Sequence, residues 1–78
     1  MPSLPPATRQ YANELAAFGD RVRQFRAARG MTQLELAEAA GLDRKTVSRV
    51  ENARFSPTLA NVFAIAAGLS VAVNDLIS

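Results

Sequence analysis

The sequence contains no cysteine and no histidine. Without cysteine, the chain can form neither a disulfide framework nor a thiolate metal site. Without histidine, it lacks the most common general base and the most common zinc ligand. It also has no glycine-rich phosphate-binding loop, so no catalytic constellation can be named. We therefore expect no enzyme activity, no metal site and no cofactor.

Aromatic residues and long apolar runs are also scarce. Only Tyr11 and four phenylalanines are aromatic. No apolar run approaches the ~20 residues that a membrane-spanning helix needs. The N-terminus lacks the charged and then apolar layout of a signal peptide. These features predict a cytoplasmic protein that does not associate with a membrane.

Alanine and arginine are abundant instead. Fifteen of the 78 residues are alanine, the strongest helix former, and no segment alternates in the manner of a β-strand. This composition predicts one all-α domain. A chain this short buries only roughly 60 % of its unfolded surface, which favours association with a second copy. The net charge is only +2, but every basic residue except Lys45 is an arginine, and arginine suits contacts with phosphate and guanine.

The apolar pattern divides the chain into a tail and five helices. Residues 1–12 hold three prolines and no helical period, which predicts a flexible N-terminal tail. An alternative for this tail is an arm that reaches along DNA through Arg9. The domain itself is predicted at residues 13–78. Its helices are expected to begin at Asn13 and end at Gly30, and then to cover 33–40, 44–52, 57–69 and 72–77.

The clearest start signal for a helix is the segment Thr32-Gln33-Leu34-Glu35. It has the pattern of a capping box, in which Thr32 caps the amide of Glu35 and Glu35 reaches back to the amide of Thr32. Met31 and Leu36 stand at the positions of the accompanying hydrophobic staple. This segment therefore predicts the beginning of the helix at 33–40.

The predicted helices 33–40 and 44–52 are joined by a short turn that contains Gly41. This is the layout of a helix-turn-helix unit, whose turn needs a residue that can adopt a positive φ. If Val47 and Val50 face inward, the outward face of the second helix carries Arg44, Lys45, Ser48 and Arg49. Such a face fits the major groove of DNA. The alternative interpretation is a solvated helix face that binds nothing.

From about Phe18 to Ile77 the chain resembles the lambda-repressor-like, Xre-type helix-turn-helix family, which includes the phage Cro and CI repressors. The resemblance implies a compact five-helix DNA-binding domain with the helix-turn-helix at the second and third helices. The chain departs from the family pattern at Ser70 and at Asn52-Ala53, where a glycine is usual. The matching positions are Arg26, Gly30, Thr32-Gln33, Leu36-Ala37, Gly41-Leu42, the run from Thr46 to Asn52, Pro57-Thr58-Leu59, Ile65-Ala66 and Asp75-Leu76.

The resemblance also implies a role for individual residues. Arg26 and Glu51 match a pair that forms a salt bridge between the first helix and the recognition helix. The expected base-contacting residues are Arg44, Lys45, Ser48 and Arg49. The expected phosphate-contacting residues are Thr32, Gln33, Arg54, Thr58 and Asn61. An alternative for Ser48 is a hydrogen bond from its hydroxyl back to the carbonyl of Arg44.

The last residues of the chain include four apolar side chains within seven positions: Val71, Val73, Leu76 and Ile77. They can close the core, or they can form a dimer interface of the kind that family members often have, on a two-fold axis that matches a palindromic operator. We expect a homodimer that binds double-stranded DNA and regulates transcription, as a repressor or autorepressor in a bacterium or phage. A phage repressor, a restriction–modification controller and an antitoxin with a toxin partner share this chemistry. A purely structural helical domain is the remaining alternative.

Overall fold

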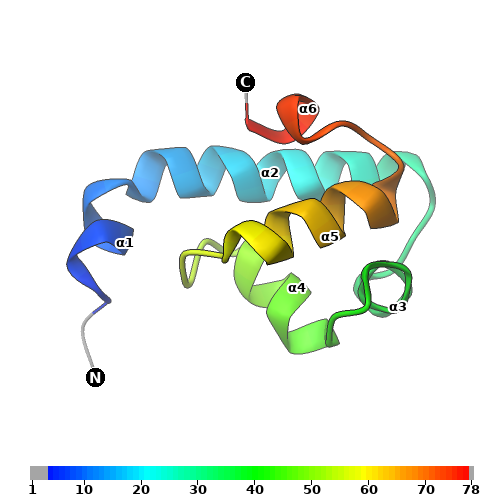
Figure 1. Ribbon diagram of the computed structural model, residues 1–78, viewed down its shortest axis with the longest axis horizontal. Helices are drawn as coiled ribbons and strands as arrows, with labels where there is room; N and C mark the ends of the chain where they lie inside the picture. The colour runs from blue at the N-terminus through cyan, green and yellow to red at the C-terminus, as the bar shows by residue number, and fades with distance from the viewer. Residues whose placement is uncertain (1–3, 78) are drawn as a thin grey trace.

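The computed structural model describes residues 4–77, and over that range the chain is all-helical, without strands. In Figure 1 the long helix α2 extends across the molecule, α6 lies above it, and α3, α4 and α5 lie below. Within the described range no helix is long and apolar enough to cross a membrane. Within residues 4–77 six helices follow one another: α1 (Pro6–Gln10), α2 (Ala12–Ala28), α3 (Gln33–Ala40), α4 (Arg44–Glu51), α5 (Leu59–Leu69) and α6 (Val73–Ile77).

The core forms where α2 to α6 meet. Each of these helices turns one apolar stripe inward, as the helical spacing of the sequence predicts. Val47 and Val50 of α4 are 0 % and 2 % exposed, so the inward face of this helix is the predicted one. The buried apolar side chains are Phe18, Val22, Leu36, Ala37, Val47, Val50, Ile65, Ala66, Leu69 and Leu76.

The predicted start and stop signals of the helices are largely confirmed. The Thr32 hydroxyl oxygen accepts from the Glu35 amide at 3.1 Å, and the Glu35 carboxylate accepts from the Thr32 amide at 2.8 Å. This is the complete capping box of α3. Gly30 and Gly41 take φ values of +65° and +71°, so both glycines end their helices in the left-handed conformation.

The N-terminal segment differs from the prediction. The sequence predicts a tail without helix over residues 1–12, of which residues 1–3 lie outside the described range, and five helices in the domain. The structure has a sixth helix, α1, whose first turn is favoured by Pro6. Its Thr8 side chain is only 2 % exposed. A helix of five residues is too short for an apolar period to reveal it in the sequence.

Several helix boundaries also differ by a residue or two, which is the usual scatter. Asn13 is not the N-cap of the long helix, because α2 begins at Ala12 directly after Tyr11. Asn52 is the C-cap of α4 and lies outside it. Pro57 precedes α5, whose N-cap is Thr58.

Two turns adopt the left-handed conformation without a glycine. Ala53, after α4, has a φ of 54°, and Ser70, after α5, has a φ of 58°. These are the two places where the sequence departs from the family pattern. The chain therefore keeps the turn geometry that glycine would favour and carries the steric strain of a Cβ there.

Candidate nucleic-acid interface

The candidate interface is the outward face of α4. The side chains of Arg44, Lys45 and Arg49 are exposed, and Ser48 is half-buried between them. All four lie on the helix whose other face is fixed in the core by Val47 and Val50. The structure therefore brings the four predicted base-contacting residues together on one helix.

The turn between α3 and α4 sets where α4 begins. Gly41 ends α3, and the Leu42 amide donates to the Ala37 carbonyl at 2.8 Å. The Asp43 carboxylate then accepts from the Thr46 amide at 2.8 Å and caps α4. These hydrogen bonds from Thr46 hold the pKa of Asp43 below its ordinary value. A negative charge at this end of the helix also interacts favourably with the helix dipole.

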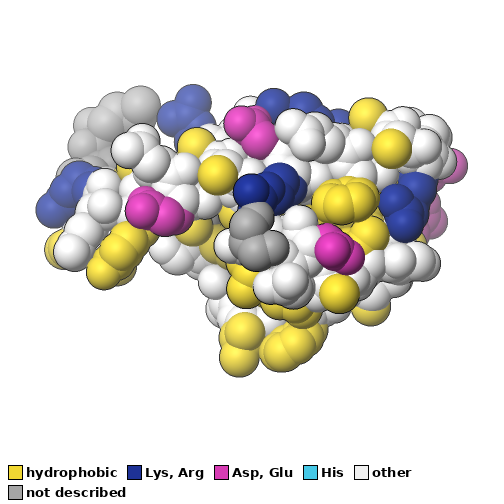
Figure 2. Space-filling view, turned by 90° about the horizontal axis from the view of Figure 1, so that it is seen from above, with side chains coloured by type: hydrophobic (Ala, Val, Ile, Leu, Met, Phe, Trp, Pro, Cys, Tyr) yellow, Lys and Arg dark blue, Asp and Glu magenta, His cyan; other side chains and the backbone are white. Residues whose placement is uncertain are grey.

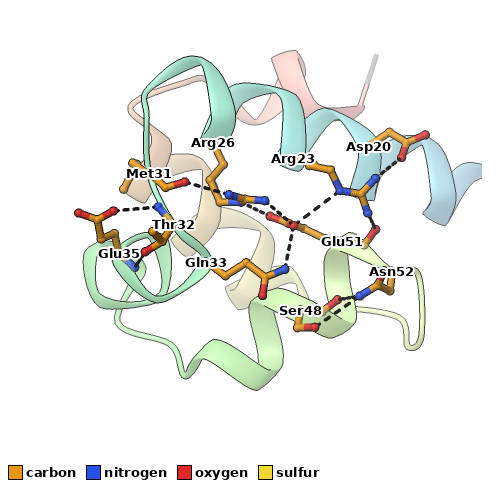
Figure 3. A network of polar contacts seen from close by, with 10 residues as sticks. All are labelled: Asp20, Arg23, Arg26, Met31, Thr32, Gln33, Glu35, Ser48, Glu51 and Asn52. Carbon is orange, nitrogen blue, oxygen red and sulfur yellow. Dashed lines mark hydrogen bonds and ion pairs between the residues drawn. The ribbon is translucent and has the colours of Figure 1, made fainter.

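The C-terminal end of α4 is held by a polar network centred on Glu51, whose side chain is 1 % exposed (Figure 3). Arg26 of α2 donates from Nε and Nη2 to the two carboxylate oxygens at 2.6 and 3.0 Å. Gln33 of α3 donates from Nε2 to Glu51 Oε1 at 3.0 Å. Arg26 also donates to the Met31 carbonyl at 2.8 Å. One buried carboxylate therefore links α2, α3 and α4.

The Arg26–Glu51 ion pair is the one that the family resemblance implies. Its hydrogen bonds raise the pKa of the Arg26 guanidinium above its ordinary value, against the effect of burial. Two parallel hydrogen bonds between a guanidinium and a carboxylate fix direction as well as distance. The pair therefore sets the orientation of α4 on the domain.

Arg23 is a member of this network that the sequence analysis missed. Its Nη2 donates to the backbone carbonyl of Glu51 at 2.8 Å, and its Nε lies 3.8 Å from the Glu51 carboxylate. A cation at the last carbonyl of a helix satisfies an otherwise free acceptor and complements the dipole. No local sequence pattern reveals this contact, because Arg23 and Glu51 are 28 positions apart.

A glycine allows α2 and α4 to approach closely at the same place. A Cβ at Gly19 would lie 2.5 Å from the Val50 carbonyl oxygen and 2.9 Å from that of Glu51. Both distances are too short for any side chain. Gly19 therefore lets the C-terminal turn of α4 rest directly on α2.

The expected phosphate-contacting residues lie at two helix starts and in the loop after α4. Thr32 and Thr58 are the N-caps of α3 and α5, and each hydroxyl oxygen accepts a backbone amide at 3.1 Å. The hydroxyl hydrogen of each threonine is still free to donate. Arg54 is exposed, and Asn61 is half-buried in the first turn of α5. Gln33 differs, because its amide already donates to Glu51; the Nε2 group has a second hydrogen for another acceptor.

The hydrogen-bond partner of Ser48 is Asn52, whereas the alternative for its hydroxyl was the carbonyl of Arg44. Asn52 Nδ2 donates to the Ser48 carbonyl at 2.9 Å and lies 3.4 Å from its hydroxyl oxygen. The side chain of Ser48 is thus linked toward the end of α4 and not toward Arg44.

Of the four C-terminal apolar residues, Leu76 is placed differently from the predicted dimer interface. Leu76 is 0 % exposed and closes the core, so its assignment to a dimer surface is wrong. Val71 and Val73 pack partly against the same core. Ile77 is 61 % exposed, and on α5 Leu59 and Phe63 are 68 % and 56 % exposed. Figure 2, seen from the side of α6, shows apolar side chains reaching the surface between charged ones.

A helix-turn-helix family profile matches residues 22–76, a range that begins within α2 and ends within α6. The chain belongs to the helix-turn-helix family of lambda-repressor-like, Xre-type regulators. This family consists of DNA-binding transcription regulators and not of enzymes.

Similar proteins support this assignment. An uncharacterized HTH-type transcriptional regulator of Archaeoglobus fulgidus is 39% identical over 56 residues, which cover 72% of this chain and 80% of the relative. The immunity repressor protein of Bacillus phage phi105 is 34% identical over 59 residues, which cover 76% of this chain but only 41% of the repressor.

Two solved structures have the same fold. The restriction-modification controller protein C.AhdI from Aeromonas hydrophila superposes with a TM-score of 0.80 at 36% identity, over 82% of this chain and 97% of the controller. The hypothetical transcription factor NHTF from Neisseria superposes with a TM-score of 0.81 at 36% identity, over 100% of this chain and 85% of that protein.

Proposed function

We propose that this regulator reads a specific DNA sequence with α4 and represses transcription as a homodimer on a palindromic operator. The observation that carries the proposal is the contrast between the two faces of α4. Arg44, Lys45 and Arg49 are exposed on one face, whereas Val47 and Val50 fix the other face in the core. A rigid helix with a cationic outer face fits the major groove.

Sequence recognition rests on the side chains that face outward. Arg44 or Arg49 pairs in bidentate fashion with O6 and N7 of a guanine, which gives about 1–3 kcal/mol of discrimination against another base. Lys45 accepts either a guanine or a phosphate as partner, because its ammonium is a point charge. Ser48 contributes a hydroxyl that is shared with Asn52.

Backbone contacts give affinity and register without reading the sequence. Arg54 supplies a charge, while Thr32 and Thr58 supply hydroxyl donors at the positive ends of α3 and α5. Gln33 uses the second hydrogen of its amide, and Asn61 lies in the first turn of α5.

The dimer is proposed to form through the apolar side chains at the end of the chain. Ile77 is the most exposed member of the predicted stripe, and Val71 and Val73 are partly exposed beside it. Leu59 and Phe63, one turn apart on α5, are further apolar side chains at the surface. A two-fold axis through this surface presents two α4 helices to half-sites about one helical turn apart.

The test is selection from a randomised duplex library at about physiological salt, followed by sequencing of the retained duplexes. The expected result is a two-fold symmetric motif with guanines in each half-site. The motif that an Arg44→Ala, Arg49→Ala double variant selects is expected to lack those guanines. A control that removes a distant surface charge, Arg29→Ala at the C-cap of α2, is expected to retain them. Recovery of unselected sequence, with binding lost at moderate salt, would contradict the proposal and favour a role in which a protein partner such as a toxin covers the apolar side chains.

A further inference from the structure

The short helix α1 is tied to the loop between α4 and α5 (residues 52–58, the α4–α5 loop). The Thr8 and Ser56 hydroxyl oxygens lie 3.0 Å apart and share a hydrogen bond across 48 positions of sequence. Thr8 is 2 % exposed, so this contact is shielded from water on the α1 side. Residues 6–10 also lie outside the range that matches the family profile.

The α4–α5 loop is anchored at its two ends by other contacts. At one end the Arg54 amide donates to the Arg49 carbonyl at 2.9 Å. At the other end the Thr58 hydroxyl accepts from the Asn61 amide. These anchored ends are also the two loop positions to which the proposed function assigns phosphate contacts.

In the middle of the loop, Ser56 and Pro57 border an apolar pocket of about 440 Å³, which is also lined by Leu15 and Phe18 of α2. Pro57 has no amide hydrogen with which to bond to a neighbour. Phe55 packs partly against the core, and the Thr8–Ser56 hydrogen bond ties the next residue to α1.

We propose that α1 is a positioning element for DNA binding: by holding Ser56, Thr8 fixes the α4–α5 loop in the shape that presents Arg54 and Thr58 to the DNA backbone. This inference rests on the proposed function. Its physical basis is preorganisation, since a loop that is already ordered loses less conformational entropy when DNA binds. The contacts concerned are phosphate contacts, so the effect on affinity is the same for every sequence.

Thr8→Val separates this role from general stability. Valine has nearly the shape of threonine, and the freed Ser56 hydroxyl is exposed and bonds to water, so the fold is expected to keep its melting temperature. Affinity for the selected operator is expected to fall about two- to tenfold, the range expected when one further side chain must be ordered on binding. Affinity for a mismatched operator is expected to fall by the same factor. Thr8→Ser keeps the hydroxyl and is expected to restore wild-type binding.

A double-mutant cycle with Arg54 tests the positioning role itself. If Thr8 acts by placing Arg54, Thr8→Val weakens binding much less in an Arg54→Ala background than in the wild type. Hydrogen exchange of the loop amides in the free protein is expected to rise in Thr8→Val and not in Arg54→Ala.

The outcomes are distinct for the two proposals. Wild-type enrichment of an operator together with unchanged affinity of Thr8→Val overturns this inference alone. An equal loss in both backgrounds of the cycle also overturns it, because the effect is then independent of Arg54. Failure of the wild-type protein to enrich any sequence overturns the proposed function and this inference together.

Discussion

Gln33 and Glu51 are joined by a hydrogen bond of 3.0 Å, so the residue that begins α3 holds the residue that ends α4. The same carboxylate receives Arg26 at 2.6 Å. The relative placement of the two helices of the helix-turn-helix is therefore set by a buried polar contact in addition to the apolar core. A directional contact of this kind limits rotation of α4, which apolar packing alone restricts less.

Replacing Glu51 with alanine is expected to destabilise the domain by about 3–5 kcal/mol, because it leaves Arg26 without its buried partner. For a small domain of about 5–15 kcal/mol total stability this is a large fraction. Urea unfolding followed by circular dichroism measures the effect. The control is Glu38→Ala on α3, an exposed acid, which is expected to change the free energy of unfolding little. If Glu51→Ala and Glu38→Ala are equally stable, the buried contacts of Glu51 do not stabilise the domain and the prediction is wrong.

Glycine is expected to stabilise the two strained turns. At Ala53 and Ser70 the φ values are 54° and 58°, and a Cβ costs about 1–2 kcal/mol in this conformation. Since glycine is also more flexible in the unfolded chain, the net gain for Ala53→Gly or Ser70→Gly is about 0.5–1 kcal/mol. Thermal unfolding is the measurement, and Ala16→Gly within α2 is the control, with an expected loss of about 1 kcal/mol. A lower melting temperature for both turn variants would show that the turns are not strained.

Gly19→Ala is expected to destabilise the protein although it replaces glycine in the middle of a helix. Alanine normally gains about 1 kcal/mol at such a position. Here the added Cβ would stand 2.5 Å from the Val50 carbonyl oxygen, and forced overpacking costs about 1–3 kcal/mol. Chemical denaturation gives the free energy of unfolding, and DNA binding is expected to weaken with it because α4 must move. If Gly19→Ala is as stable as the wild type, α2 and α4 can move apart without a loss in the free energy of unfolding, which would contradict the prediction.

The capping carboxylate of Asp43 predicts a dependence of stability on pH. Its hydrogen bonds from Thr46 lower its pKa below the ordinary value of 3.8. A group whose pKa is lower in the folded state stabilises the fold above the unfolded pKa, and this stability is lost as the pH falls through the folded value. Asp43→Asn keeps a capping oxygen but does not titrate. The melting temperatures of the wild type and Asp43→Asn are compared at pH 6 and below pH 4. The advantage of the wild type at pH 6 is expected to disappear or to reverse below pH 4. A constant difference between the two proteins would show that Asp43 does not contribute to the acid sensitivity.

The local features of the fold were predictable because each depends on residues only a few positions apart. The capping box of α3, the left-handed Gly41 and the inward face of α4 all follow from spacing within one or two helical turns. The cationic outer face of α4 follows from the same arithmetic. These features were sufficient to place the candidate recognition helix.

The features that were missed depend on contacts between distant segments. Arg23 caps α4 from 28 positions away, and Thr8 holds Ser56 from 48 positions away. Leu76 was assigned to a dimer surface because periodicity shows that a residue is apolar but not which neighbour covers it. The helix α1 has too few residues to show a period. Tertiary packing decided each of these cases.

In the proposed function α4 reads the DNA sequence while the flanking residues bind its backbone. The most direct test compares the wild type with Arg44→Ala, Arg49→Ala and Arg54→Ala on the selected operator and on a duplex with one half-site guanine replaced, across a series of salt concentrations. Arg49→Ala, or Arg44→Ala if that residue holds the guanine, is expected to lose about 1–3 kcal/mol of discrimination between the two duplexes. Arg54→Ala should instead weaken both duplexes equally and lower the salt slope by about one. Unchanged discrimination in both Arg44→Ala and Arg49→Ala would contradict sequence reading by α4, because the specificity would then lie elsewhere on the protein.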